Sequence, residues 1–242
     1  MSNAIAIFTE SGFGKTSSLG KISKEDLPGL EEDIQGVNPE ETLLINVKGK
    51  PLPFRGWKKF YSPITIDSPP LTGNYLSTTD HSLIVKTMNF FDTNRPDIKN
   101  IIIDDAQYLM AEEFMNNALK AGFEKFSKMA KNMYDVINAG IKLRPNVNFI
   151  ILAHSEETKD GYKMKTIGKM LDEKVTLEGL FTVILYGKTS FNPSEKTSKK
   201  EFVTNFDGQY PAKSPIGMFK KLYIPNDLGL VINTVNDYYN GE

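Results

Sequence analysis

The sequence predicts an α/β protein with a mainly parallel sheet flanked by helices, formed as a single domain over residues 1–242. Two observations indicate this class. Short apolar runs alternate with amphipathic segments along the chain, which is the pattern of strand–helix–strand units. Turn residues separate these segments, and the chain contains no internal repeat or long linker. A β-hairpin is expected near the C-terminus, within the lysine-rich region 188–221.

Each strand is predicted from a short apolar run bounded by turn residues. The expected strands cover residues 5–8, 42–47, 101–103, 147–153 and 181–186, with a further short strand at 64–66. Residues 80–91 carry apolar side chains at helical spacing behind Asp80, a typical N-cap residue. Residues 106–140 are expected to be helical with a break near Gly122, and the chain to end in a short helix. Asp207-Gly208 is expected to turn the C-terminal hairpin.

The composition excludes several classes of protein. With a formal net charge of −1, the chain as a whole is not a polycation drawn to nucleic acid, so such binding needs a local patch. The absence of cysteine excludes disulfides, thiolate metal sites and cysteine nucleophiles. No apolar run reaches the roughly 20 residues that span a bilayer, and the N-terminus lacks the pattern of a signal peptide. We therefore expect a cytoplasmic protein with no membrane partner.

A glycine-rich stretch near the N-terminus, "SGFGKTSS", follows the first predicted strand and precedes residues compatible with a helix. Such a loop binds phosphate through backbone amides, a helix N-terminus and a lysine that reaches the outer phosphates. The predicted nucleotide-binding residues are Ser11, Gly12, Phe13, Gly14, Lys15, Thr16 and Ser17. Thr9 stands where the P-loop pattern has its first glycine, which is a departure from the motif. The alternative is a strand-to-helix turn with an incidental lysine.

Two adjacent carboxylates end the apolar run "NIIIDD". A P-loop protein needs an acidic residue at the end of a neighbouring strand for Mg²⁺. The pattern assigns Asp104 to this metal, together with the hydroxyl of Thr16. Asp105 then stands where many ATPases carry the group that orients the attacking water, which makes it a candidate catalytic residue beside Lys15. An N-cap role for one of the two aspartates is the simpler alternative.

His154 directly follows the predicted strand "NFIILA". In a parallel sheet this end of the strand points towards the nucleotide crevice. The imidazole is therefore a candidate group for sensing the terminal phosphate or for hydrogen-bonding the attacking water. A partly buried histidine that caps the next loop is an equally simple interpretation.

Seven lysines lie in the region 188–221 against three carboxylates, so this region carries a local excess of positive charge. Such a patch can bind the phosphate backbone of single-stranded DNA, and interleaved aromatic side chains can stack on its bases. The aromatic residues are Phe191, Phe202, Phe206, Tyr210 and Phe219. A solvated hairpin with a half-buried aromatic face accounts for the same residues.

The chain resembles the RecA-like P-loop ATPases of tailed phages, a group that includes the Sak-type single-strand annealing ATPases. The resemblance covers nearly the whole length. It is closest in "LINVKGKPLPFRGW", "FEKFSKMAKNMYDVI", "NFIILAHSEE" and "YKMKTIGKMLDEKVTLEGLFTVILYG". It implies a RecA-like core, ATP with Mg²⁺, and assembly of identical subunits into a ring or filament with nucleotide sites between subunits.

The resemblance also implies roles for individual lysines. In these relatives a basic residue of the C-terminal hairpin reaches the neighbour's ATP site, and Lys213 occupies that position here. The relatives often carry an arginine two residues later, where this chain has Pro215, and a catalytic glutamate after the second strand, where it has "INVKGK". The loop after the His154 strand faces the DNA channel in such a core, although it can equally be a lid that docks on the next subunit. The candidate DNA contacts in this loop are Lys163, Lys165 and Lys169.

The principal hypothesis is an ATP-binding, Mg²⁺-dependent ATP-hydrolysing phage protein that acts on single-stranded DNA in recombination or replication, in the host cytoplasm. Its candidate catalytic residues are Lys15, Asp105, His154 and Lys213. The alternative is a nucleotide-dependent phage assembly or packaging factor with protein partners and little turnover. A small-molecule kinase is a third hypothesis, but the chain has only three arginines and none lies in an evident lid.

Overall fold

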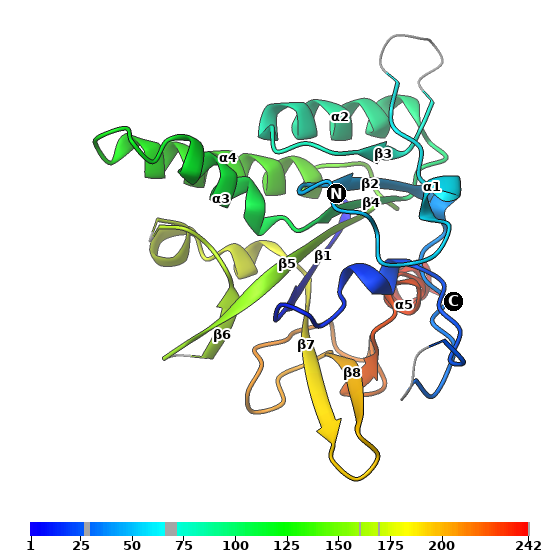
Figure 1. Cartoon of the computed structure of the whole chain (residues 1–242). Coiled ribbons are helices and arrows are strands. Elements are labelled where there is room, and N and C mark those ends of the chain that lie inside the picture. The colour runs from blue at the N-terminus through cyan, green and yellow to red at the C-terminus, as the bar shows by residue number, and fades with distance from the viewer. Residues whose placement is uncertain (27–29, 66–71, 160, 169, 242) are drawn as a thin grey trace.

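A computed structural model describes residues 1–26, 30–65, 72–159, 161–168 and 170–241. Its centre is a nine-stranded sheet in the order β3-β2-β4-β5-β1-β7-β8-β9, with β6 paired to β5 (Figure 1). The strands are β1 (Asn3–Thr9), β2 (Thr42–Asn46), β3 (Tyr75–Leu76), β4 (Asn100–Asp104), β5 (Asn148–Thr158), β6 (Gly161–Met164), β7 (Val183–Asn192), β8 (Thr197–Val203) and β9 (Tyr223–Pro225). The helices are α1 (Trp57–Phe60), α2 (His81–Asn94), α3 (Gln107–Asn116), α4 (Glu124–Ile141) and α5 (Leu228–Asn240). Single turns of 3₁₀ or π helix cover Thr16–Leu19, Pro39–Glu41, Leu171–Val175 and Leu177–Leu180.

Six neighbouring strands of the sheet are parallel, namely β3, β2, β4, β5, β1 and β7. The antiparallel strands β8 and β9 extend the sheet beyond β7. The expected α/β class with a mainly parallel sheet flanked by helices is therefore confirmed. Thr9 at the end of β1 pairs with His154 of β5, and Asp104 ends β4 beside them. Because β1, β4 and β5 run in one direction, these three residues lie at the same edge of the sheet, here called the carboxyl edge.

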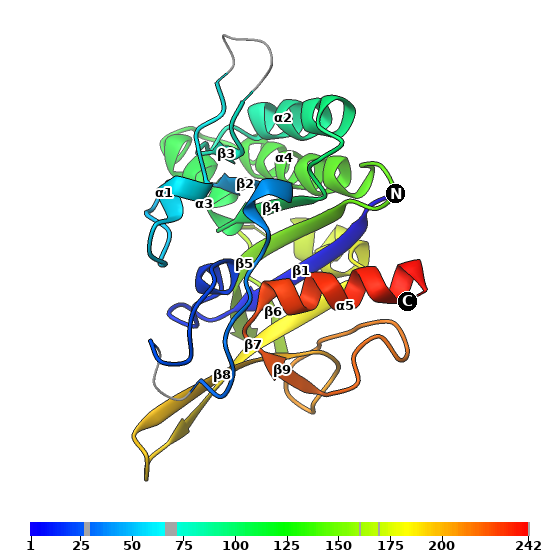
Figure 2. The ribbon, with the colours of Figure 1, turned by 90° about the vertical axis from the view of Figure 1, so that its right-hand side faces the viewer.

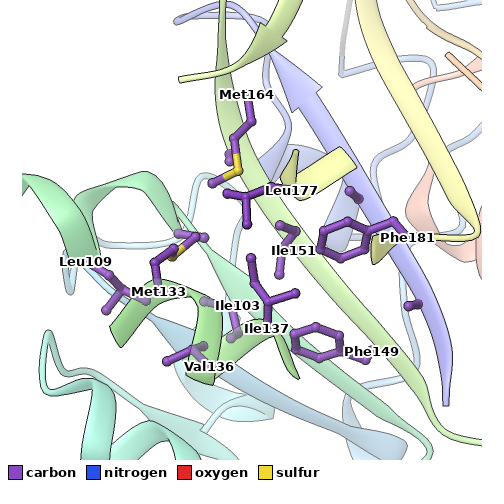
Figure 3. Packing of buried hydrophobic residues seen from close by; sticks show 14 of the residues in the cluster. Ile103, Leu109, Met133, Val136, Ile137, Phe149, Ile151, Met164, Leu177 and Phe181 are labelled. Carbon is purple, nitrogen blue, oxygen red and sulfur yellow. The ribbon is translucent and has the colours of Figure 1, made fainter. Parts of the chain in front are cut away.

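Both faces of the sheet are buried, as is usual for parallel strands. Successive side chains of a strand point to opposite faces, so Ile101 and Ile103 pack with α2, α3 and α4, whereas Ile102 packs on the side of α5. Figures 1 and 2 show these helices on the two faces, and Figure 3 shows the larger core between the sheet and α4. No helix in the described part of the chain is long and apolar enough to cross a membrane.

The prediction of a helix after the glycine-rich stretch is wrong. The chain forms a single 3₁₀ turn there, Thr16–Leu19. The amide of Val37 donates to the carbonyl of Leu19, which takes the acceptor that a continuing helix would use. Gly20 is extended, and a Cβ at this position would lie 2.4 Å from the ring of Phe54. Packing against residues that are distant in the sequence therefore ends this turn.

The C-terminal hairpin forms between β7 and β8 and not at Asp207-Gly208 as expected. Its turn lies at residues 193–196, where the side-chain oxygen of Asn192 accepts hydrogen bonds from the amides of Ser194 and Glu195. The carboxylate of Asp207 instead accepts from Lys188 and from the hydroxyl of Tyr223, which ties an irregular segment to β7.

The short strand expected at 64–66 is reduced, among the residues described, to isolated bridges at Pro63 and Thr65, and Ile66 lies outside the described residues.

Asp227, the N-cap of α5, also holds the segment that precedes β2. Its buried carboxylate accepts hydrogen bonds from two amides of its own helix, Gly229 and Leu230. It also accepts from the amides of Gln35 and Gly36, at 2.7 and 3.1 Å. The carboxylate thus joins two parts of the chain that are almost 200 residues apart.

We predict that Asp227→Ala lowers the free energy of unfolding by about 2–4 kcal/mol, because a helix cap is lost and the amides of Gln35 and Gly36 also lose their acceptor. The matched control is Asp80→Ala, which removes an exposed N-cap whose carboxylate accepts from the amides of Ser82 and Leu83 in its own helix. This variant should lose about 1 kcal/mol. Urea denaturation of both variants measures the difference, and equal losses would show that the contacts with residues 35 and 36 add nothing.

Candidate functional site

The glycine-rich loop projects from the end of β1 at the carboxyl edge. Gly12 and Gly14 both have left-handed backbone conformations, with φ of +83° and +95°. A Cβ at Gly12 would meet no atom within 4 Å, so open space faces this part of the loop. Between them, the ring of Phe13 is buried against Phe202 of β8, with ring centroids 5.7 Å apart. The loop is therefore anchored by one aromatic side chain while its backbone curves around open space.

Thr9 replaces the first glycine of the P-loop pattern without straining the chain. It is the last residue of β1, in extended conformation, and needs no positive φ. The methyl group of Thr9 packs against Gly187 of β7. A Cβ at position 187 would lie only 2.7 Å from this methyl group. Glycine at position 187 thus leaves room for a side chain at position 9, where the P-loop motif usually has glycine.

The amides of the loop are available to a ligand. Within the described residues, the loop's backbone hydrogen bonds are donated by Phe13, Ser17 and Ser18, not by the amides between them. The amides of Gly14, Lys15 and Thr16 are left without an acceptor from the described part of the chain. Because only a 3₁₀ turn follows, the loop offers amides and a lysine but lacks the helix N-terminus expected from the sequence.

Thr16 and Asp104, both predicted to serve a metal ion, are in contact. The Thr16 hydroxyl donates to the carboxylate of Asp104, with its oxygen 3.1 and 3.0 Å from the two carboxylate oxygens. Asp104 is buried at the end of β4, whereas Thr16 belongs to the loop after β1. The fold therefore brings together two residues that are 88 positions apart.

Lys15, Asp105 and His154 form the centre of the site. The ammonium group of Lys15 lies 2.6 Å from Oδ1 of Asp105 and 3.2 Å from Nε2 of His154. His154 Nε2 is also 3.6 Å from the same carboxylate oxygen. Lys15 and Asp105 are both buried, with 9% and 7% of their side chains exposed. The structure thus joins three of the four catalytic candidates at the carboxyl edge.

Asp105 adopts a left-handed conformation, with φ of +62°, which is uncommon for a residue with a side chain. Although burial alone would raise the pKa of the Asp105 carboxyl, its contacts with His154 and Lys15 and the charge of Lys15 hold this pKa well below its usual range. Asp105 is therefore a stable anion and a weak acceptor of protons. Gln107 supports the arrangement, since its side-chain oxygen accepts from the amide of His154 at 3.1 Å.

Asp104 has the opposite titration behaviour to its neighbour. Burial raises the pKa of Asp104 to about 6, and the negative charge of Asp105 adds to the rise. The charge of Lys15 and the hydrogen bond from Thr16 act in the other direction but do not outweigh these effects. A divalent cation next to Asp104 would favour its ionised form.

Lys50 is a fourth member of the cluster that the sequence analysis did not identify. Its ammonium group lies 3.2 Å from Oδ2 of Asp105 and 5.1 Å from the centre of the Tyr108 ring. Lys48, two residues earlier, lies over the same ring at 5.2 Å but pairs with Glu112. The signal in the sequence is "INVKGK", a strand end that carries two lysines and no glutamate.

Lys200 and Asn226 hold the other side of the loop and were also missed. Lys200 of β8 donates to the carbonyl of Gly12 at 2.9 Å. The side-chain amide of Asn226, which follows β9, donates to the carbonyl of Gly14 at 3.1 Å. No pattern in the sequence indicates these contacts, because they depend on the pairing of β8 with β7 and of β9 with β8.

Lys213 does not join this cluster within its own chain. Its backbone pairs with Ile184 near the start of β7, and Ile184 is level with Ala6, three residues before the end of β1. Its exposed side chain therefore stands away from the carboxyl edge. A contribution to the site of a neighbouring subunit stays a prediction.

The segment after His154 forms a two-stranded extension instead of an open loop. Strands β5 and β6 pair as far as Thr158 and Gly161, and Lys163 forms an ion pair with Glu156 at 3.4 Å. The amide of Lys165, an exposed residue, donates to the carbonyl of His154 at 2.7 Å, so this segment is tied directly to the site. Lys169 lies outside the described residues.

Much of the lysine-rich region 188–221 is engaged with other groups. Lys188 pairs with Asp207, and Lys199 pairs with Glu31 and Glu201. Phe202 and Tyr210 are buried and cannot stack on bases, and Phe219 is half-buried. Of the five aromatic residues considered for stacking, Phe191 and Phe206 are exposed, at 62% and 66%.

The described residues contain no group of three or more His, Cys, Asp or Glu side chains that could hold a metal ion. Mg²⁺ at nucleotide sites is usually held by one or two protein ligands, with water and phosphate oxygens completing an octahedron. The donor set of Thr16 and Asp104 fits this second arrangement. A scan of the chain against protein-family models finds no match, and a search among curated proteins finds none either.

We predict that Asp104→Asn stabilises the protein at pH 7.5 in the absence of metal and nucleotide, by on the order of 3 kcal/mol. The folded protein holds the Asp104 proton up to a pKa of about 6, whereas the unfolded chain releases it near 3.8. The cost of ionising Asp104 in the folded state therefore grows as pH rises from 4 to 6 and is fully present above.

Thermal melts of the wild type and Asp104→Asn in EDTA measure this effect. The difference in melting temperature should be present at pH 7.5 and nearly absent at pH 4, where both side chains are neutral. A variant that is less stable than the wild type at pH 7.5 would contradict the assignment.

Proposed function

We propose that the chain binds ATP with Mg²⁺ and hydrolyses it in a RecA-like P-loop core. The observation that carries this proposal is the pair of contacts between the glycine-rich loop and the end of β4. Thr16 contacts Asp104, and Lys15 contacts Asp105. If the lysine of this turn were incidental, we would expect it to be exposed to solvent and not buried against the carboxylate at the end of a strand.

The loop supports the binding of a triphosphate in three ways. Gly12 has open space beside the backbone, and the amides of Gly14, Lys15 and Thr16 have no acceptor in the described chain. The buried ammonium of Lys15 stands beside them. Backbone amides and an ammonium group in one concave loop are the elements that bind phosphate oxygens. In the proposal, phosphate takes over from Asp105 as the partner of Lys15.

The metal-side residues support Mg²⁺ at the same place. Bound Mg²⁺ neutralises the charge that develops on the β- and γ-phosphates during hydrolysis. Thr16 and Asp104 hold it, and the two residues are already in contact across the loop and β4. The strand order supports a RecA-like core, because β5 with His154 lies between the strands of the loop and of Asp104.

Asp105 and His154 act on the attacking water and the terminal phosphate in this proposal. Because the pKa of Asp105 is held well below its usual range, this carboxylate orients water by accepting a hydrogen bond and does not store the proton. His154 lies within 3.2 Å of the Lys15 ammonium, and its carbonyl accepts from Lys165. A change at the phosphate can therefore reach the β5–β6 extension through one residue.

Lys50 supplies the second cation of the site in this proposal. In the phage ATPases that the chain resembles, an arginine often has this role. It shares the Asp105 carboxylate with Lys15 and reaches it from the turn after β2. The hydrogen bond and charge of Asp105 raise the pKa of Lys50, although burial acts against the rise, so the group stays protonated at neutral pH. We assign Lys50 to the terminal phosphate in hydrolysis.

Single-stranded DNA, assembly into a ring or filament, the phage origin and the cytoplasmic location remain predictions of the sequence. The exposed side chain of Lys165, whose amide donates to the carbonyl of His154, supports a positive charge near the site. The burial of Phe202 and Tyr210 removes part of the stacking surface that the DNA hypothesis used.

The test of the nucleotide site is a calorimetric titration of ATP with Mg²⁺ into the wild type and Lys15→Ala. The variant should lose on the order of 100-fold in affinity, since a charge-assisted contact worth about 3 kcal/mol is removed. Thr16→Ala is the companion variant: it keeps Lys15 but should lose the gain in affinity that Mg²⁺ gives over EDTA. Unchanged ATP affinity in Lys15→Ala would refute the assignment of the loop.

A second prediction separates Lys50 from Lys48. Lys50→Ala should slow steady-state ATP hydrolysis roughly 10-fold, about 1.4 kcal/mol, while ATP affinity changes little. Lys48→Ala is the matched control, because Lys48 lies over the same Tyr108 ring but pairs with Glu112. Lys48→Ala should keep the wild-type rate, and Lys50→Arg should recover most of the rate that Lys50→Ala loses. Equal rates in the two alanine variants would remove Lys50 from the catalytic set.

A further inference from the structure

A groove with a volume of about 1310 Å³ begins beside the glycine-rich loop. Its walls are β8, the segment from Gly217 to Asn226 that includes β9, the helix α5, and residues 30–34. It lies beyond β7 in the sheet, on the opposite side of the loop from Asp104, Asp105 and His154. The loop therefore has the acidic residues on one side and this groove on the other.

Two of the residues that line the groove also bind the loop. Lys200 donates to the carbonyl of Gly12, and Asn226 donates to the carbonyl of Gly14. Both groups come within 4 Å of the position that a Cβ of Gly14 would occupy. The groove is thus continuous with the loop, and Lys200 stands at the junction between them.

Asn226 carries an unpaired acceptor at this junction. The residue is 6% exposed, and its side-chain oxygen has no hydrogen-bond partner among the residues that the structure describes. The assignment of the two amide atoms is fixed by the carbonyl of Gly14, which requires the nitrogen. A buried acceptor without a partner is costly in a folded protein and is commonly satisfied by a ligand or water.

The lining suits an uncharged ligand with flat apolar faces and polar edges. Met218, Ile224 and Leu230 provide apolar surface, and Thr197, Ser198 and Thr234 provide hydroxyl groups. Five lysines of the lining stand with four carboxylates, and Lys199 is paired with Glu31 and Glu201. The groove is therefore close to electrically neutral, which disfavours a polyanionic DNA backbone as its occupant.

We propose that this groove binds the nucleoside of the nucleotide whose phosphates lie in the glycine-rich loop. The inference rests on the proposed function, because it takes the phosphate site as given. The terminal phosphate lies toward Lys15, Asp105 and His154, so the nucleoside extends the other way, past Lys200 and Asn226. Donor groups of the base or ribose satisfy the Asn226 oxygen, and Lys200 faces the phosphate next to the ribose.

The test compares ATP with inorganic tripolyphosphate, which carries the phosphates without a nucleoside. Both are titrated with Mg²⁺ by calorimetry into the wild type, Ser198→Trp and Ser194→Trp. Ser198 is exposed on β8 and lines the groove, so tryptophan there fills it. Ser194 is exposed in the turn of the same hairpin and is not part of the lining, which makes it the matched control.

The expected result is that Ser198→Trp weakens ATP binding at least about 10-fold and leaves tripolyphosphate binding unchanged. Ser194→Trp should change neither affinity. Unchanged tripolyphosphate binding also shows that the Ser198→Trp variant is folded around the loop. Equal affinities of the wild type for the two ligands, unaltered ATP binding in Ser198→Trp, or loss of both ligands in that variant would overturn the nucleoside site. Failure of the wild type to bind either ligand would refute the proposed function itself.

Discussion

The buried ion pair between Lys15 and Asp105 is the contact on which the arrangement of the site depends. A lysine and an aspartate that leave water together lose much of their hydration, so the pair is costly unless further polar contacts compensate. His154 and Lys50 supply such contacts, both to Asp105. If one partner were removed, the remaining charge would be left in a poorly solvated place. The same pair gives Lys15 a position, because a free lysine side chain samples many rotamers.

The ion pair forms because the parallel strands β1, β4 and β5 end at the same edge of the sheet. β1 and β4 are separated by β5, and all three bring polar residues to the carboxyl edge after apolar runs. The left-handed turn at Asp105 then divides the two carboxylates between two partners. Asp104 meets the Thr16 hydroxyl, whereas Asp105 meets the Lys15 ammonium. In the proposed function this division separates the metal-side carboxylate from the one that orients water.

The strand ends of this site were largely predictable from the sequence, since the runs before Asp104 and His154 are apolar and short. The meeting of Lys15, Thr16 and the two aspartates followed from motif spacing and from the direction of parallel strands. Lys50, Lys200 and Asn226 were not predictable, because each reaches the loop or Asp105 through tertiary contacts that no spacing encodes.

The errors in local structure have a related cause. The turn Thr16–Leu19 does not extend into a helix because Val37 takes the Leu19 carbonyl, a contact between distant residues. Asp207-Gly208 has good turn chemistry, but the carboxylate of Asp207 is held by Lys188 and Tyr223. The helix capped by Asp80 was predicted well, because its signals are local. Local signals were reliable wherever no distant partner competed for the same hydrogen-bonding group.

The most direct measurement is a crystal structure of the chain with Mg²⁺ and a non-hydrolysable ATP analogue. We expect the Lys15 ammonium to leave Asp105 for a phosphate oxygen, while Thr16 and Asp104 stay together at the metal. An unbroken contact between Lys15 and Asp105, with the analogue bound elsewhere or absent at saturating concentration, would contradict this expectation.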